Sequence, residues 1–155
     1  MVTIEWCRKK PLGIRLISPN TNMADSYMKM AEESIIALSG LGKSRIWTAT
    51  ASYYVFYYSL YALMLKIGIK CEIHSCSIEF MNKMLGNFYS KKDNSMIKKA
   101  FSARIDLQYY ADREVEQKII EECRIYCKDF FIKTKHILSV IREDEIEDIR
   151  KRMTI

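Results

Sequence analysis

The stretch from Ile46 to Leu65 carries no charged residue, and this constrains the fold more than any other feature of the chain. A helix of that composition has no face suited to open water. The stretch is long enough for a membrane span, but tyrosine prefers the membrane interface to the hydrocarbon centre. Five tyrosines lie along it: Tyr53, Tyr54, Tyr57, Tyr58 and Tyr61. We therefore expect the central helix of a soluble bundle and no contact with a membrane.

Length and composition indicate a single helical domain. The chain has 155 residues, of which 49% are hydrophobic and 28% are charged. This predicts one domain, residues 1–155, that is large enough to bury a proper core. The N-terminal sequence Met1–Cys7 is followed, not preceded, by basic residues, unlike a secretory signal. We therefore expect a cytoplasmic protein.

Hydrophobic periodicity predicts a series of helices joined by short connections. Gly68 is expected to end the uncharged helix. The predicted helices cover Thr21–Ser39, Lys43–Ile67, Ser75–Leu85, Asp93–Ala111 and Glu114–Ile141. Long amphipathic helices with short loops predict an all-α fold, an antiparallel up-and-down helical bundle of four to five main helices.

The two ends of the chain differ from the bundle. Residues 1–19 are predicted to be irregular and basic, with a short strand at Val2–Cys7. Residues 142–155 are predicted to form a charged helical tail, acidic first and basic last, as the helix dipole favours. Within the tail, Glu147–Lys151 and Asp148–Arg152 have the i, i+4 spacing of ion pairs.

The chain has five cysteines, and without an export signal we expect reduced thiols that act as small buried hydrophobes. Cys71, His74 and Cys76 can be drawn together as a metal site. Their spacing matches no standard zinc motif, so we expect no metal and no cofactor. The remaining cysteines are Cys7, Cys123 and Cys127.

Arg104 is the strongest single candidate for function. It lies in a predicted helix among Ala100, Phe101, Leu107 and Gln108 at helical spacing. A guanidinium in such surroundings must be paired, or must face a place where an anion can bind. The alternative to a functional role is an ion pair with a carboxylate from another helix or a second subunit. Gln108, one turn after Arg104, is better placed than Asp106 to orient the guanidinium.

Basic residues near the start of the same helix favour an anionic ligand. Lys91, Lys92, Lys98 and Lys99 form one cluster within the net charge of +6. Such clusters are usually solvated surface, but they also suit a polyanion such as RNA. Lys98 is therefore a candidate ligand contact.

Several motifs occur together in one order along the chain. They are Ala31-Glu32-Glu33-Ser34, Ala51-Ser52-Tyr53-Tyr54-Val55-Phe56-Tyr57 with Ala62-Leu63 and Gly68, then His74, then Arg104 with Tyr109-Tyr110 before a long final helix. In this order the sequence resembles the HEPN domain family from about Met23 to Leu138. The resemblance implies a helical bundle that dimerises. Many members resemble ribonucleases or toxins encoded beside a minimal nucleotidyltransferase antitoxin.

The resemblance also implies a site in which an arginine is followed by a histidine, with four to six residues between them. Here Tyr109, Tyr110 and Ala111 occupy those positions, so the motif histidine is replaced. Tyrosine can donate a hydrogen bond but is a poor base at neutral pH. His74, which corresponds to a histidine of many relatives, can act as the missing acid or base, or can instead satisfy a neighbour structurally.

The predicted catalytic residues are therefore Arg104, Tyr109 and His74, and the predicted ligand-binding residues are Gln108, Tyr110 and Lys98. Three functions remain open from the sequence. The first is a toxin component that acts as a metal-independent ribonuclease across a homodimer. The second is a catalytically inactive module that binds a nucleotide or a nucleotidyltransferase partner. The third is a purely structural dimerisation domain.

Overall fold

The computed structural model describes residues 1–154, and the chain in this range is predominantly helical. The elements are α1 (Ile4–Arg8), β1 (Arg15–Leu16), α2 (Thr21–Gly40), α3 (Arg45–Ile67), β2 (Ile69–Lys70), α4 (His74–Met84), α5 (Lys91–Tyr109), α6 (Gln117–Val140) and α7 (Glu143–Thr154). The predicted all-α helical bundle is confirmed, and the five predicted bundle helices correspond to α2 to α6.

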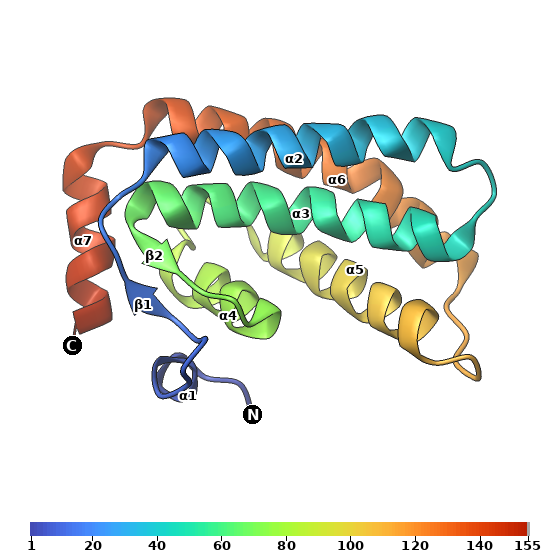
Figure 1. Cartoon of the computed structure of the whole chain (residues 1–155), viewed down its shortest axis with the longest axis horizontal. Helices are drawn as coiled ribbons and strands as arrows, with labels where there is room; N and C mark the ends of the chain where they lie inside the picture. The colour runs from blue at the N-terminus through green and yellow to red at the C-terminus, as the bar shows by residue number, and fades with distance from the viewer. Residues whose placement is uncertain (155) are drawn as a thin grey trace.

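The uncharged helix α3 is the centre of the bundle. It packs against α2, α5 and α6, and the short helix α4 lies beneath one half of it (Figure 1). Ser44 caps its N-terminus by accepting a hydrogen bond from the Trp47 backbone, and Gly68 ends it with a left-handed φ of 85°. Most of α3 is buried, whereas Tyr54 and Tyr58 are only partly covered. The other helices of the bundle therefore cover most of the uncharged surface of α3.

The N-terminal segment differs from its prediction. Residues Ile4–Arg8 form a helical turn and not a strand. Thr3 caps that turn by accepting from the Trp6 backbone, and Glu5 and Arg8 lie at the ends that the helix dipole favours. The strand pairing comes later, where β1 runs antiparallel to β2 with Arg15 opposite Lys70.

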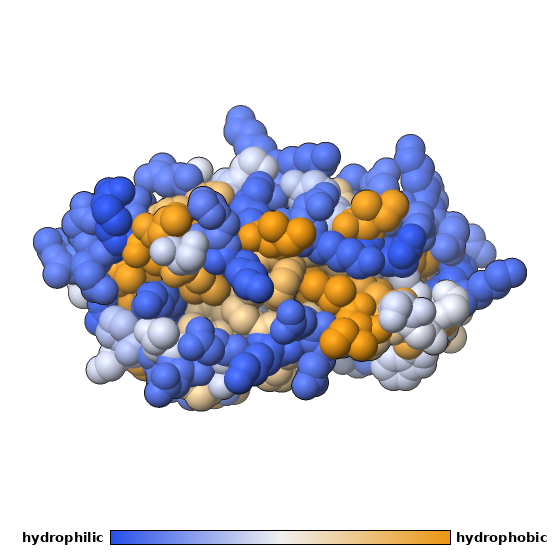
Figure 2. All heavy atoms as spheres, turned by 90° about the horizontal axis from the view of Figure 1, so that it is seen from above, coloured by the Kyte–Doolittle hydropathy of each residue, from blue (hydrophilic) through white to orange (hydrophobic). Residues whose placement is uncertain are grey.

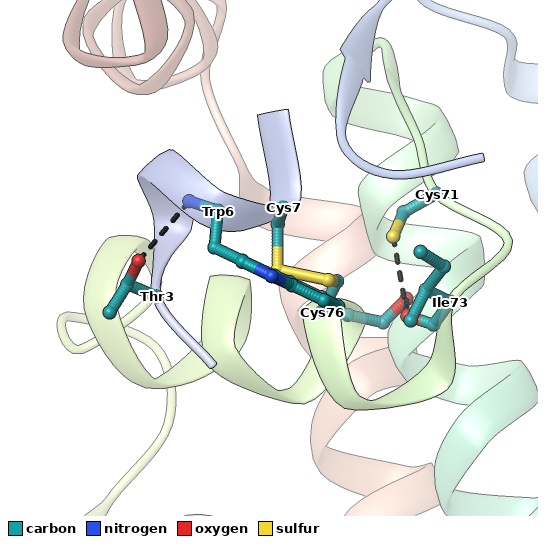
Figure 3. Close-up of a disulfide and its surroundings, with 7 residues drawn as sticks. Thr3, Trp6, Cys7, Cys71, Ile73 and Cys76 are labelled. Atoms are coloured by element: carbon teal, nitrogen blue, oxygen red, sulfur yellow. Dashed lines mark hydrogen bonds between the residues drawn. A yellow bond between two sulfur atoms is a disulfide. The ribbon is translucent and has the colours of Figure 1, made fainter. Parts of the chain in front are cut away.

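The expectation of five reduced thiols is wrong for two of the cysteines. Cys7 of α1 and Cys76 of α4 form a disulfide across 69 residues of sequence (Figure 3). Cys76 is therefore not free to bind a metal with Cys71 and His74. Cys71, Cys123 and Cys127 are free and buried, as expected. Burial raises the pKa of the Cys127 thiol to about 12, so it is an unreactive packing residue.

Polar contacts hold α7 against one end of the bundle. The Arg150 guanidinium of α7 donates to the backbone carbonyls of Ile17, Ile67 and Gly68, where β1 and β2 meet. The two i, i+4 pairs predicted in the charged tail are both present, since Lys151 lies 3.9 Å from Glu147 and Arg152 lies 3.0 Å from Asp148. The tail is thus a helix that closes one end of the bundle.

The face formed by α2 and α6 is partly apolar. Figure 2 shows hydrophobic residues along its middle, bordered by hydrophilic ones. Ile36 of α2 and Ile125, Ile132 and Val140 of α6 are more than half exposed. No helix among residues 1–154 combines the length and the hydropathy needed to cross a bilayer.

Candidate functional site

Arg104 lies on α5 and is held by neighbours from its own helix. Its Nε donates to Gln108 Oε1 at 3.1 Å, and a terminal nitrogen donates to the Tyr109 hydroxyl at 3.3 Å. Gln108 is thus in contact with the guanidinium, in the position from which it was expected to orient it. Asp106 instead pairs with Arg113 at 2.6 Å, so the guanidinium does not share its charge with that carboxylate.

Tyrosine rings surround the same guanidinium. Its central carbon lies 5.2 Å from the ring centre of Tyr54, 5.3 Å from that of Tyr53 and 5.8 Å from that of Tyr109. Each distance is within the range of a cation–π interaction. Aromatic faces attract the guanidinium but leave its charge uncompensated. Among residues 1–154, no carboxylate lies within 4.0 Å of Arg104.

His74 is the first residue of α4, and α3 fixes its ring. The imidazole stacks on Tyr57 with ring centres 3.9 Å apart and an interplanar angle of 10°. Its Nδ1 lies 2.7 Å from the Tyr53 hydroxyl. Tyr53 is fully buried and this is the partner its hydroxyl has, so the hydroxyl donates to Nδ1 and the ring proton sits on Nε2.

The positive charge of Arg104 disfavours protonation of His74. Burial, and then the positive charge of Arg104, lower the pKa of His74 to about 4. The imidazole is therefore neutral at pH 7 and offers an N–H donor without a charge of its own. Burial also raises the pKa of Tyr53 and Tyr57 well above the usual value, so both hydroxyls stay protonated. The cluster carries one positive charge, on Arg104.

The structure brings four of the six predicted site residues together. Arg104, Gln108 and Tyr109 are in contact, and His74 lies beside them across Tyr53. We call this group, with Tyr53, Tyr54 and Tyr57, the arginine–histidine cluster. The Tyr109 side of the cluster is open to solvent, since that residue is 63% exposed.

Tyr110 and Lys98 are placed elsewhere. The Tyr110 ring stacks under the Arg113 guanidinium at 3.5 Å. Lys98 borders a surface hollow of ≈ 460 Å³ together with Asp106 and Glu116. The contact predicted between these two residues and a ligand at Arg104 is therefore not supported within one chain.

Sequence reasoning missed the roles of Tyr53 and Tyr57. The sequence places both in the uncharged helix and in one of the ordered motifs but assigns neither to the site, although Tyr53 orients His74 and Tyr57 stacks on it. Their i, i+4 spacing on α3 places them on one face, which is a usable signal. The position of α4, which brings His74 onto that face, could not be predicted from the sequence.

A scan of the chain against models of known protein families finds no match, and neither does a search of curated proteins.

Proposed function

We propose that the arginine–histidine cluster binds a phosphate group of RNA or of a nucleotide, and that the chain is a HEPN-type component of a toxin–antitoxin-like system. The binding proposal is based on the surroundings of the Arg104 guanidinium. Gln108 and Tyr109 orient this group, and it faces tyrosine rings instead of a carboxylate. A guanidinium held in this way has donors to spare for a phosphate.

The neighbours of Arg104 suit the same ligand. Tyr109 adds a hydroxyl, and neutral His74 adds an N–H donor. Exposed tyrosine faces provide a surface on which a base can stack. α4 begins at His74 and its N-cap residue, Ile73, supplies no side-chain hydrogen bond. The first backbone N–H groups of α4 therefore add partial positive charge at His74.

The HEPN resemblance adds the biological part of the proposal. It implies a homodimer, with a minimal nucleotidyltransferase as a possible partner. Exposed aromatic residues near the start of α3 and the end of α5 support a dimer, because Trp47 is 56% exposed and Tyr109 is 63% exposed. Two copies joined here would bring two arginine–histidine clusters close together.

Ribonuclease activity is a second candidate, and the proximity of His74 to Arg104 favours it. Cleavage by the 2′-hydroxyl of RNA needs a proton acceptor, a proton donor and stabilisation of charge on phosphorus. With its pKa at about 4, His74 is a weak base in the free protein. A bound phosphate would favour the imidazolium and raise that pKa, so that His74 could donate its Nε2 proton to the leaving oxygen. Tyr109 could hydrogen-bond to the leaving oxygen.

Binding of a fluorescein-labelled single-stranded RNA, with inorganic phosphate as competitor, tests the proposal. Arg104→Ala should weaken binding by about 10- to 100-fold, the equivalent of a lost charge-assisted hydrogen bond. Arg104→Lys should recover only part of the affinity, because an ammonium lacks the planar fork.

Arg113→Ala is the matched control, since Arg113 is already paired with Asp106. It should bind like the wild type. Equal binding by Arg104→Ala and wild type would refute the proposal. If Arg104→Ala lost its helical circular dichroism signal, Arg104 would be a structural residue. Cleavage of the RNA by wild type, abolished in His74→Ala, would establish the ribonuclease alternative.

A further inference from the structure

The disulfide and the arginine–histidine cluster share one helical turn. Cys76 follows His74 by two residues, so both lie in the first turn of α4. One side of this turn is bonded to Cys7, and the other is packed on Tyr57 through His74. Any loosening of the first side therefore affects the residue that completes the proposed phosphate site.

The disulfide is the main anchor of α1. This helix has only five residues, and Cys7 is its one buried side chain (Figure 3). Trp6 is 40% exposed, and Ile4 is only partly buried. A helix of five residues does not persist in water without external contacts. Removal of the covalent bond leaves α1 with little to hold it against α4.

The first turn of α4 has few other constraints at its N-terminus. Its N-cap residue is Ile73, whose side chain cannot accept a hydrogen bond from the helix. Besides the disulfide, the ring of His74 contacts Tyr53, Tyr54 and Tyr57. The backbone N–H groups of Cys76 and Ser77 donate to the Ile73 carbonyl. A turn without a cap is prone to fraying, and α1 covers it.

We infer that the Cys7–Cys76 disulfide is a redox control on the phosphate site, in which reduction by a dithiol frees α1 and loosens the turn that carries His74. Two electrons and two protons from the dithiol convert the bond to two thiols, and the dithiol becomes a cyclic disulfide. The inference rests on the proposed function. Disulfides in reducing compartments are usually transient and regulatory, which agrees with the proposed cytoplasmic location.

The three other cysteines do not substitute for this pair. Burial raises the pKa of Cys71, Cys123 and Cys127, which disfavours the thiolate that attacks a disulfide. Cys71 also donates to the Ile73 carbonyl at 3.3 Å. Cys7 and Cys76 are themselves fully buried, so an external dithiol reaches their bond when α1 moves away from α4.

The experiment compares the oxidised full chain with the same protein in excess dithiothreitol, using inorganic phosphate as the probe. Imidazole NMR signals report on the site, and the exposed His136 serves as an internal reference because the chain has only two histidines. Alkylation and intact mass confirm the redox state. Circular dichroism confirms that the bundle stays folded.

The expected result has two parts. Without phosphate, reduction should move the pKa of His74 from about 4 toward its ordinary value, because the ring is less confined. With phosphate, the apparent Kd should rise about fivefold if the ordered turn falls to roughly one fifth of the population. Cys7→Ser should behave like the reduced protein in either buffer. Cys123→Ser, which alters a buried free thiol, should behave like the wild type.

The outcomes separate the two proposals. Equal phosphate affinity and an equal His74 pKa in the two redox states would overturn the redox control and leave the proposed function intact. Absence of phosphate binding by the oxidised wild type would overturn the proposed function and the control together. Loss of the helical signal on reduction would also overturn the control, because the bond would then hold the whole fold.

Discussion

The hydroxyl of Tyr53 lies 2.7 Å from Nδ1 of His74, and this contact joins the central helix α3 to the first residue of α4. Tyr53 is fully buried, whereas His74 is only partly so. The contact thus fixes the position of His74 relative to the buried core. It also selects which imidazole nitrogen carries the proton.

Tyr53→Phe tests this contact while keeping the ring. The hydroxyl donates only to an unprotonated Nδ1, so its loss should raise the pKa of His74 above its value of about 4. The stability loss should be about 1 kcal/mol, the net value of one hydrogen bond. An NMR titration of the imidazole measures the first effect, and chemical denaturation measures the second. Tyr58→Phe, on the same helix, is the control. An unchanged His74 pKa in Tyr53→Phe would contradict the assigned donor.

His74 should also make stability depend on pH. Its pKa is about 4 in the folded protein and near 6.5 in an unfolded chain, so the unfolded state binds more protons between these values. The stabilisation is full above pH 6.5 and is lost as the pH falls toward 4. We expect a loss of about 2 kcal/mol over this window, after allowance for the partial exposure of the ring.

Denaturant unfolding at several pH values between 4 and 7 measures this dependence. His74→Gln cannot titrate in the window, so its stability should change less than that of the wild type between pH 7 and pH 4.5. Parallel curves for the two proteins would show that other groups cause the dependence. Phosphate should narrow the window for the wild type, since a bound anion raises the pKa of His74.

A buried carboxylate far from the cluster gives a prediction on stability alone. Asp93 is fully buried, and its carboxylate accepts from the Ser90 backbone at 2.7 Å, from Tyr126 at 2.9 Å and from Lys133 at 2.6 Å. Burial raises the pKa of Asp93, but these partners outweigh that effect and hold the pKa below its usual range. Asp93→Asn would leave Lys133 without its partner.

The expected cost of Asp93→Asn is about 2 kcal/mol, because charge-assisted hydrogen bonds to a buried group are lost, whereas Lys133 is 38% exposed and stays in contact with water. Denaturant unfolding measures it, and phosphate binding should stay at the wild-type level wherever the variant is folded. Glu147→Gln, which removes an exposed pair with Lys151, should cost less than about 1 kcal/mol. Equal costs for the two variants would contradict the assigned role of Asp93.

The sequence predicted the parts of the fold that depend on local patterns. The five bundle helices have a strong 3.6-residue periodicity, and their ends differ from the predictions by a few residues. The contact between Arg104 and Gln108 was predictable for the same reason, because residues four apart on a helix are neighbours. Both ion pairs of the C-terminal tail were likewise predictable from i, i+4 spacing.

The features that the sequence did not predict depend on distant packing. Nothing near Cys7 indicates Cys76, since the pairing arises only when α1 lies against α4. The strand predicted at residues 2–7 is a helical turn because Thr3 caps it and the disulfide holds it. The place of His74 on Tyr57 likewise depends on how α4 meets α3.

The proposed homodimer can be assigned to one of two exposed apolar surfaces. The first is aromatic and lies near the arginine–histidine cluster. Trp47 precedes Tyr54 by seven residues, which is two turns along the same face of α3, and Tyr109 and Tyr110 end α5. The second is the aliphatic face of α2 and α6 in Figure 2. Ile132 of α6 is 63% exposed. We predict that the aromatic surface forms the interface, because Trp and Tyr dominate the energetics of protein interfaces.

Light scattering behind a sizing column should give twice the chain mass of 18.3 kDa for the wild type. Trp47→Ser should shift the protein to the monomer mass, since loss of a central aromatic anchor costs at least about 2 kcal/mol of association. Ile132→Ser and Trp6→Ser, which change exposed residues on other surfaces, should leave the dimer intact. A dimer lost only in Ile132→Ser would move the interface to the α2–α6 face and separate the two arginine–histidine clusters. A wild-type monomer at micromolar concentration would contradict the homodimer itself, while phosphate binding by a single chain could still be measured.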